Sequence, residues 1–132
     1  MAKKTEKITL AYCPEGECAP IFQAVPVRAV DAWVEGILGT DELIVRPTVF
    51  SGIQMICKKH DNDEHYNWVA SCIYLHNRDD CIGGDAFLCR VDYHKQPDGK
   101  IRILGLTEHD KTRINSASDR IFKNHKRLEI EL

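Results

Sequence analysis

The sequence predicts an α+β fold in which a mostly antiparallel sheet of hairpins has two helices packed on one face. Short apolar segments with the two-residue period of strands recur along the chain, whereas two segments, residues 26–38 and 107–124, show helical spacing. Most consecutive strands are too close together for the dozen or more residues that a parallel crossover needs. With 132 residues the chain is expected to form a single domain, 1–132, with residues 1–7 frayed.

The expected strands are recognised by alternation and by the turn residues between them. In the first strand, Ile8, Leu10 and Tyr12 alternate with smaller residues, as in a half-buried strand. Pro47 predicts that its strand lies at an edge or contains a bulge. A QPDG turn separates two later strands. The expected strands cover residues 8–13, 20–25, 43–49, 53–58, 68–75, 85–93, 100–106 and 128–132.

Each expected helix carries terminal signals. The first has Pro26 near its first position and Gly39 where a left-handed cap commonly ends a helix. Thr107 is a candidate N-cap for the second, because carboxylates follow in the first turn, where the helix dipole favours them. This helix is expected to end at about Asn124. The apolar stripe of the first helix consists of Val27, Val30, Val34 and Ile37.

Composition and the N-terminus indicate a cytoplasmic protein. The N-terminal residues lack the apolar run of a signal peptide, and no stretch approaches the ~18 apolar residues of a membrane span. The formal charge of -2 excludes neither an acidic nor a basic partner. No Rossmann or P-loop fingerprint is present.

The six cysteines are expected to be reduced, because disulfides are rare in cytosolic proteins. Several of them fall in expected strands, where cysteine packs as a small hydrophobe. We therefore expect no metal or cofactor. The alternative is a zinc site, since CKKH has a suitable ligand spacing and CPEGEC supplies two more thiols. Its ligands would be Cys13, Cys18, Cys57 and His60.

A polar stretch before the strand at residues 85–93 is the expected ligand-binding site. Asparagine can bond its own backbone in a turn, and arginine offers five donors suited to carboxylate or phosphate. Paired glycines permit a close backbone approach. The predicted site comprises Asn77, Arg78, Gly83, Gly84 and Asp85. The alternative is that Asn77 and Arg78 only fix the turn.

Residues 33–107 resemble an uncharacterised family from phages and mobile genetic elements of Firmicutes, the domain of unknown function numbered 3846. The shared features are a short helix that ends in glycine, a hairpin, the Asn77-Arg78 pair, the Gly-Asp-Ala-Phe run at 84–87 and Leu106-Thr107 before a helix. The resemblance implies a phage or mobile-element setting and no catalytic residues. It suggests interference with a host defence system, through a host protein or a small anionic ligand.

These observations favour a non-enzymatic binding protein. A nucleic-acid-binding accessory protein is one alternative, because Arg113, Arg120 and Lys123 recur along one face of the second helix and could meet phosphates. A small metal-dependent enzyme is the other. No membrane partner is expected, and a homo-oligomer is compatible with the sequence.

Overall fold

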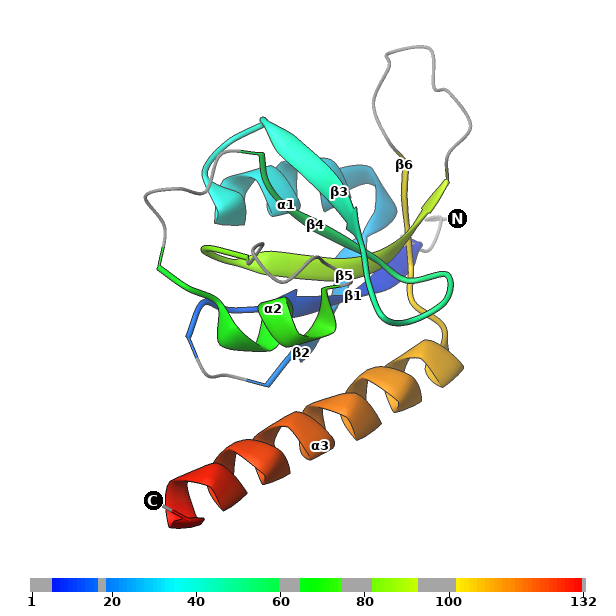
Figure 1. Ribbon diagram of the computed structural model, residues 1–132. Helices are drawn as coiled ribbons and strands as arrows, with labels where there is room; N and C mark the ends of the chain where they lie inside the picture. The colour runs from blue at the N-terminus through cyan, green and yellow to red at the C-terminus, as the bar shows by residue number, and fades with distance from the viewer. Residues whose placement is uncertain (1–5, 17–18, 60–64, 75–81, 93–101, 132) are drawn as a thin grey trace.

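A computed structural model describes residues 6–16, 19–59, 65–74, 82–92 and 102–131, with side chains up to residue 123. Within these residues the chain forms one antiparallel sheet of six strands, three α-helices and a short 3-10 helix (Figure 1). The predicted α+β class with an antiparallel sheet is confirmed. The strands are β1 (Lys7–Cys13), β2 (Ile21–Pro26), β3 (Leu43–Pro47), β4 (Gln54–Lys58), β5 (Ala86–Asp92) and β6 (Arg102–Leu104). The helices are η1 (Val27–Ala29), α1 (Val30–Leu38), α2 (Trp68–Ile73) and α3 (Glu108–Glu131).

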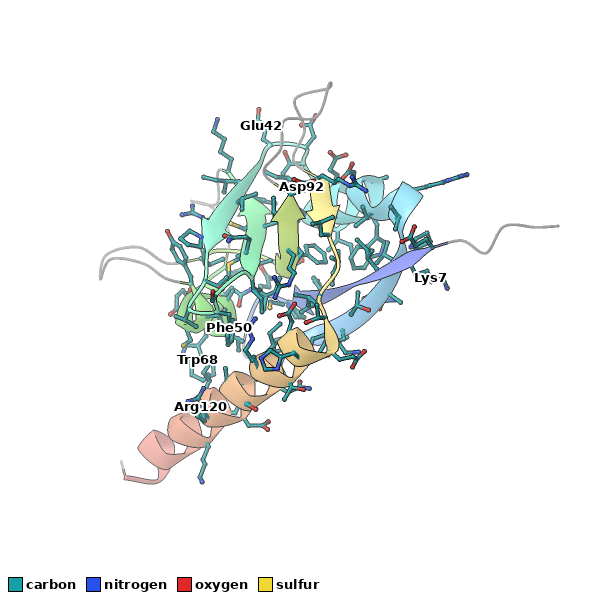
Figure 2. All side chains as sticks on the ribbon, turned by 90° about the vertical axis from the view of Figure 1, so that its right-hand side faces the viewer. Lys7, Glu42, Phe50, Trp68, Asp92 and Arg120 are labelled. Atoms are coloured by element: carbon teal, nitrogen blue, oxygen red, sulfur yellow. The ribbon has the colours of Figure 1, made fainter. Side chains whose placement is uncertain are left out.

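The sheet has the strand order β2-β1-β5-β4-β3, and β6 also pairs with β5. Seen at right angles to Figure 1, strands β3, β4, β5 and β6 lie side by side (Figure 2). After β6 the chain meets β1, where the Leu106 amide donates to the Thr9 carbonyl at 2.8 Å. The chains approach so closely that a Cβ on Gly105 would lie 2.9 Å from the Ile8 Cβ, so only glycine fits there without a shift.

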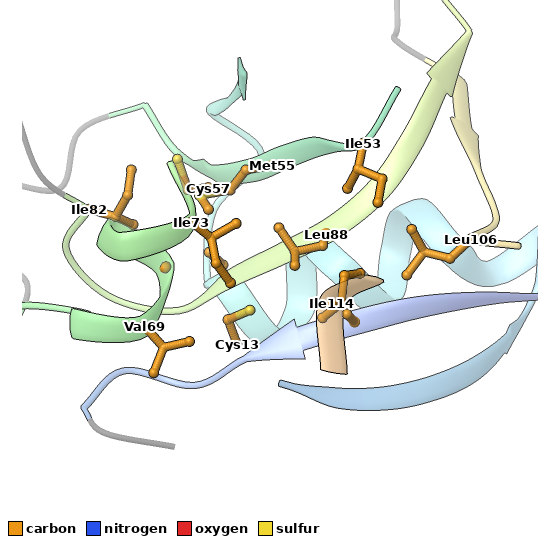
Figure 3. Packing of buried hydrophobic residues seen from close by; sticks show 13 residues of the cluster. Cys13, Ile53, Met55, Cys57, Val69, Ile73, Ile82, Leu88, Leu106 and Ile114 are labelled. Carbon is orange, nitrogen blue, oxygen red and sulfur yellow. The ribbon is translucent and has the colours of Figure 1, made fainter. Parts of the chain in front are cut away.

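Both faces of the sheet are covered. Successive residues are buried in β4 and in the first half of β5, which is typical of strands with a core on each side. On one face Phe87 packs with residues of α1; on the other Leu88 packs with residues of α2 and with Ile114 of α3 (Figure 3). The expectation of two helices on one face is therefore corrected to α1 on one face and α2 and α3 on the other. The signal in the sequence for this arrangement is that β4 and the first half of β5 contain consecutive apolar residues, instead of apolar residues alternating with polar ones.

Residues 68–75 were expected to be a strand, but Trp68–Ile73 form α2. The Asn67 side chain caps this helix by accepting a hydrogen bond from the Ala70 amide at 3.0 Å. An apolar run this short is compatible with either a buried helix or a buried strand. The cap provided by Asn67 favours the helix. Tyr74, directly after the helix, makes one isolated antiparallel bridge with Thr48.

The expected strand at residues 128–132 is also wrong over the described residues, because α3 continues to Glu131 instead of ending near Asn124. Neither glycine nor proline occurs after Thr107, so no residue type that commonly stops a helix interrupts it. The first predicted helix is confirmed, and Gly39 ends α1 in the left-handed conformation with φ of 75°. Residues 1–5, part of the segment expected to fray, lie outside the described residues.

Candidate ligand-binding pocket

A pocket of about 270 Å³ opens at the end of the sheet where β1 and β4 finish and β5 begins. The start of β5 lies at the left in Figure 1. Because β1 and β4 both run antiparallel to β5, their last residues meet the residue that precedes β5. The C-terminal turn of α1 closes one side. We call this hollow the Asp85 pocket, and it is lined by Glu15, Ile37, Leu38, Lys58 and Asp85.

Asp85 is held in place by groups of β1 and the turn that follows it. Its Oδ1 atom accepts a hydrogen bond from the Glu15 amide at 2.8 Å. The Tyr12 hydroxyl bonds to the same carboxylate, and burial together with this bond raises the pKa of Tyr12 to about 12. Tyr12 therefore remains a donor at neutral pH. Two of the roughly four acceptor positions of an ionised carboxylate are used, which orients Asp85 and leaves acceptor capacity for a ligand.

The predicted ligand-binding residues are only partly brought together. Asp85 lines the pocket, whereas Asn77 and Arg78 lie outside the described residues. Gly83 and Gly84 are buried, and the Gly84 amide donates to the His65 carbonyl at 2.7 Å. The two glycines therefore fix the chain before Asp85 by backbone pairing. Of the three members of the predicted set that the structure describes, Asp85 is the one that lines the pocket.

A second charged centre lies where α3 starts. Asp110 is fully buried and receives two hydrogen bonds from Arg90, of 2.6 and 2.7 Å, and one from Arg113 of 2.7 Å. The Thr107 amide donates to the same carboxylate at 2.9 Å, and the Thr107 hydroxyl accepts from the Asp110 amide, as in a capping box. Gly52 leaves room for Arg90, since a Cβ there would lie 2.8 Å from Nη1. This network joins α3 to β5 and leaves little of the carboxylate for a ligand.

The same network includes Arg113, one of the three basic residues that were predicted to contact nucleic acid. Arg113 is anchored on the protein body, because its guanidinium also donates to the Ser51 carbonyl at 3.1 Å and lies 5.9 Å from the Phe50 ring centre. Arg120 and Lys123 are exposed on α3. The predicted stripe thus retains two exposed cations, which is a weak basis for phosphate binding.

The proposed zinc ligands are not assembled in the part of the chain that the structure describes. Cys13 and Cys57 are buried in strands on either side of Ala86, and the Arg46 Nε atom donates to Cys57 Sγ at 3.3 Å. Cys18 and His60 lie outside the described residues. Among the residues that are described, no group of three or more His, Cys, Asp and Glu side chains could hold a metal ion.

Thiol reactivity should follow burial. We expect Cys72 to be alkylated in the folded protein because it is exposed, whereas Cys13 and Cys89 should react only after unfolding. Burial raises the pKa of both buried thiols to about 12, so they carry almost no thiolate at neutral pH. Iodoacetamide labelling with and without denaturant, read by peptide mass spectrometry, measures this. Rapid labelling of Cys13 or Cys89 in the folded protein would contradict it.

Sequence reasoning missed most of the pocket. Glu15 stands in a turn, Lys58 ends a strand, and Ile37 and Leu38 belong to the apolar end of a helix. No motif connects these four positions, because they come from three separate segments. No local signal in the sequence could have found them, because they are brought together by strand pairing, which places the end of β1 beside the start of β5.

The chain matches no protein-family model, no curated protein and no solved structure. None of the helices in the described ranges is long and apolar enough to cross a membrane. The geometry of the Asp85 pocket is therefore the basis for inferring a function.

Proposed function

We propose that this protein acts by binding, not by catalysis, and that part of a host protein docks in the Asp85 pocket. The observation that carries the proposal is a carboxylate that is already oriented, by Tyr12 and by the Glu15 amide, at the wall of a pocket of about 270 Å³. An oriented polar group in a preformed hollow is what specific recognition requires.

The pocket lining offers charged groups for recognition. Its described residues include two carboxylates and one ammonium, and no thiol, hydroxyl or imidazole. The nearby Tyr12 hydroxyl is committed to Asp85. Among the described residues of the lining, the carboxylates of Glu15 and Asp85 outnumber the ammonium of Lys58, which favours a protein partner over the small anionic ligand.

The resemblance to a family of phages and mobile elements supplies the proposed setting. A small binding protein in that setting could counter a host defence system by occupying a surface of one of its components. The alternative of nucleic-acid binding has less support, because Arg113 is already paired with Asp110.

Site-specific photo-crosslinking in a bacterial host tests the proposal. A benzoylphenylalanine at Ile37, on the pocket wall, should crosslink to a discrete host protein, whereas the same group at the exposed Thr112 of α3 should not. The partner is then purified and its affinity is measured by calorimetry. Asp85→Asn should weaken binding by about tenfold or more, because a charge-assisted hydrogen bond is lost.

The matched control is Asp119→Asn, which removes the same charge from an exposed position on α3 and should leave affinity unchanged. A partner that crosslinks only through Thr112, or one whose affinity is the same for Asp85→Asn and the parental protein, would overturn the proposal.

A further inference from the structure

The outer edge of β2 has no partner strand among the described residues. β2 is the last strand on its side of the sheet and pairs with β1 alone. The Val27 amide donates to the Glu6 carbonyl at 2.9 Å, and these two residues continue the register of the β1–β2 ladder. Since hydrogen-bonded pairs alternate along an antiparallel ladder, the N–H and C=O groups of Ile21, Gln23 and Val25 face β1.

The other residues of β2 turn their backbone groups outwards. They are Phe22, Ala24 and Pro26, and because proline has no N–H, the edge presents two donors. Pro20 directly precedes the strand, so proline bounds this pair of donors on both sides. The side chains of Gln23 and Ala24 are exposed, which shows that no described element covers the centre of the strand.

The centre of this edge lacks the features that keep most strand edges from pairing with other chains. Charged side chains and bulges are common protective devices. β2 contains no charged residue, and its register with β1 runs without a bulge from Ile21 to Pro26. The strand at the opposite edge, β3, includes Arg46. Ile21 is 51% exposed, so apolar side-chain surface accompanies the open backbone groups.

The sequence of the edge is complementary to itself about Gln23. In an antiparallel pair of two β2 strands centred on this residue, Phe22 of each copy lies opposite Ala24 of the other, and Ile21 lies opposite Val25. Both outward amides of each copy then meet outward carbonyls, apolar side chains meet apolar ones, and the two glutamine amides can bond to each other. The neighbouring registers with the same bonding pattern would place Gln23 opposite Ile21 or opposite Val25, so a polar side chain would face an apolar one.

We propose that β2 pairs with β2 of a second copy of this chain, antiparallel about a two-fold axis at Gln23, so that two six-stranded sheets join into one. Matched pairing about a single residue is a property of a two-fold interface, in which every contact occurs twice. The absence of charge from β2 means that the copies meet without like-charge repulsion in this strand. The described residues that line the Asp85 pocket include none from β2, so the inference is independent of the proposed function.

Sedimentation equilibrium of the whole chain over a range of concentrations tests the inference. The parental protein should show a reversible equilibrium between monomer and dimer. Gln23→Lys should weaken the dimer by about tenfold or more, because it places two ammonium groups opposite each other at the axis. Gln23→Glu should do the same with two carboxylates. An equimolar mixture of the two variants should restore association, because opposite charges then meet at the axis.

A control and a second measurement identify the surface. Ser51→Lys adds the same charge in the exposed turn between β3 and β4 and should dimerise as the parental protein does. Hydrogen exchange followed by NMR should show protected amides at Phe22 and Ala24 in the parental dimer. Gln23→Lys should make both exchange rapidly, whereas the Val25 amide, which faces β1, should stay protected in each protein.

Three outcomes would overturn the inference. The first is a parental protein that remains monomeric at its highest soluble concentration. The second is a dimer in which the amides of Phe22 and Ala24 exchange as fast as they do in Gln23→Lys, since the copies would then meet at another surface. The third is failure of the mixed variants to associate when circular dichroism shows that both are folded, since Gln23 would then not lie at the axis.

Discussion

Replacing Asp110 with asparagine should lower the free energy of unfolding by about 3 kcal/mol, the lower end of the range for breaking a buried ion pair. The carboxylate is fully buried, and its partners Arg90 and Arg113 keep about a third and a quarter of their side-chain surface exposed. Asparagine has nearly the same shape but one oxygen fewer and no charge. The N–H groups of its amide would face the N–H groups of the two guanidinium groups, so donors would meet donors.

The effect should depend on pH in a defined direction. The hydrogen bond from Arg90, with help from Thr107 and Arg113, holds the pKa of the Asp110 carboxyl well below its usual range. A carboxyl with a depressed pKa stabilises the fold at pH values above its unfolded pKa of about 4, and this stability is lost as the pH falls towards the folded pKa. The parental protein should therefore lose more stability than Asp110→Asn between about pH 5 and about pH 2.

Urea denaturation followed by circular dichroism at several pH values measures both effects. Asp119→Asn is the control, because it makes the same change at an exposed position of the same helix. It should alter stability by no more than about 0.5 kcal/mol. Parallel stability curves for the parental protein and Asp110→Asn below about pH 4 would show that Asp110 does not provide the acid-sensitive stability.

Local chemistry made much of the fold predictable. The alternation of Ile8, Leu10 and Tyr12 was sufficient for β1, and Gly39 correctly ended α1 because glycine adopts the left-handed conformation without steric cost. Thr107 was correctly assigned as the start of α3, since its hydroxyl and the Asp110 carboxylate form a reciprocal cap. These signals act over a few residues, so they can be read without knowing the rest of the structure.

The wrong or missing predictions concern features that depend on contacts between residues far apart in the sequence. The helix over Trp68–Ile73 has only six residues, too few to show a reliable period. Its capping residue, Asn67, is held by bonds to Cys13 and Gly84, which are distant in the sequence. The pocket could not be predicted for a related reason. Glu15, Lys58 and Asp85 are brought together by strand pairing, and pairing partners cannot be read from a single sequence.

Replacing Asn67 with alanine should have the other large effect, a loss of about 4 kcal/mol in the free energy of unfolding. Asn67 is fully buried and uses three hydrogen bonds. Its Oδ1 atom caps α2 by accepting from the Ala70 amide, and its Nδ2 atom donates to the carbonyls of Cys13 at 3.0 Å and Gly84 at 2.8 Å. Alanine removes the cap and leaves two buried carbonyls without these donors.

The Asn67→Asp variant separates the contribution of the helix cap from that of the two hydrogen bonds donated by Nδ2. Aspartate keeps an oxygen for the cap but cannot donate when ionised, and its charge would face the carbonyls of Cys13 and Gly84. We therefore expect Asn67→Asp to be at least as destabilising as Asn67→Ala at neutral pH. If the cap were the main contribution, the aspartate variant would instead be close to the parental protein, because aspartate caps helices about as well as asparagine.

Asn67 also connects the two segments that carry the pocket carboxylates. Cys13 lies two residues before Glu15, and Gly84 directly precedes Asp85, so both nitrogen-donated bonds hold the chain beside the pocket. Loss of these bonds should displace the Glu15 amide from Asp85, and the NMR signals of both residues should shift even in protein that remains folded. Asn115→Ala, at an exposed position of α3, is the matched control and should slightly stabilise the helix, because alanine is the better helix former. A loss of less than about 1 kcal/mol in Asn67→Ala, with the signals of Glu15 and Asp85 unmoved, would mean that strand pairing alone positions the pocket.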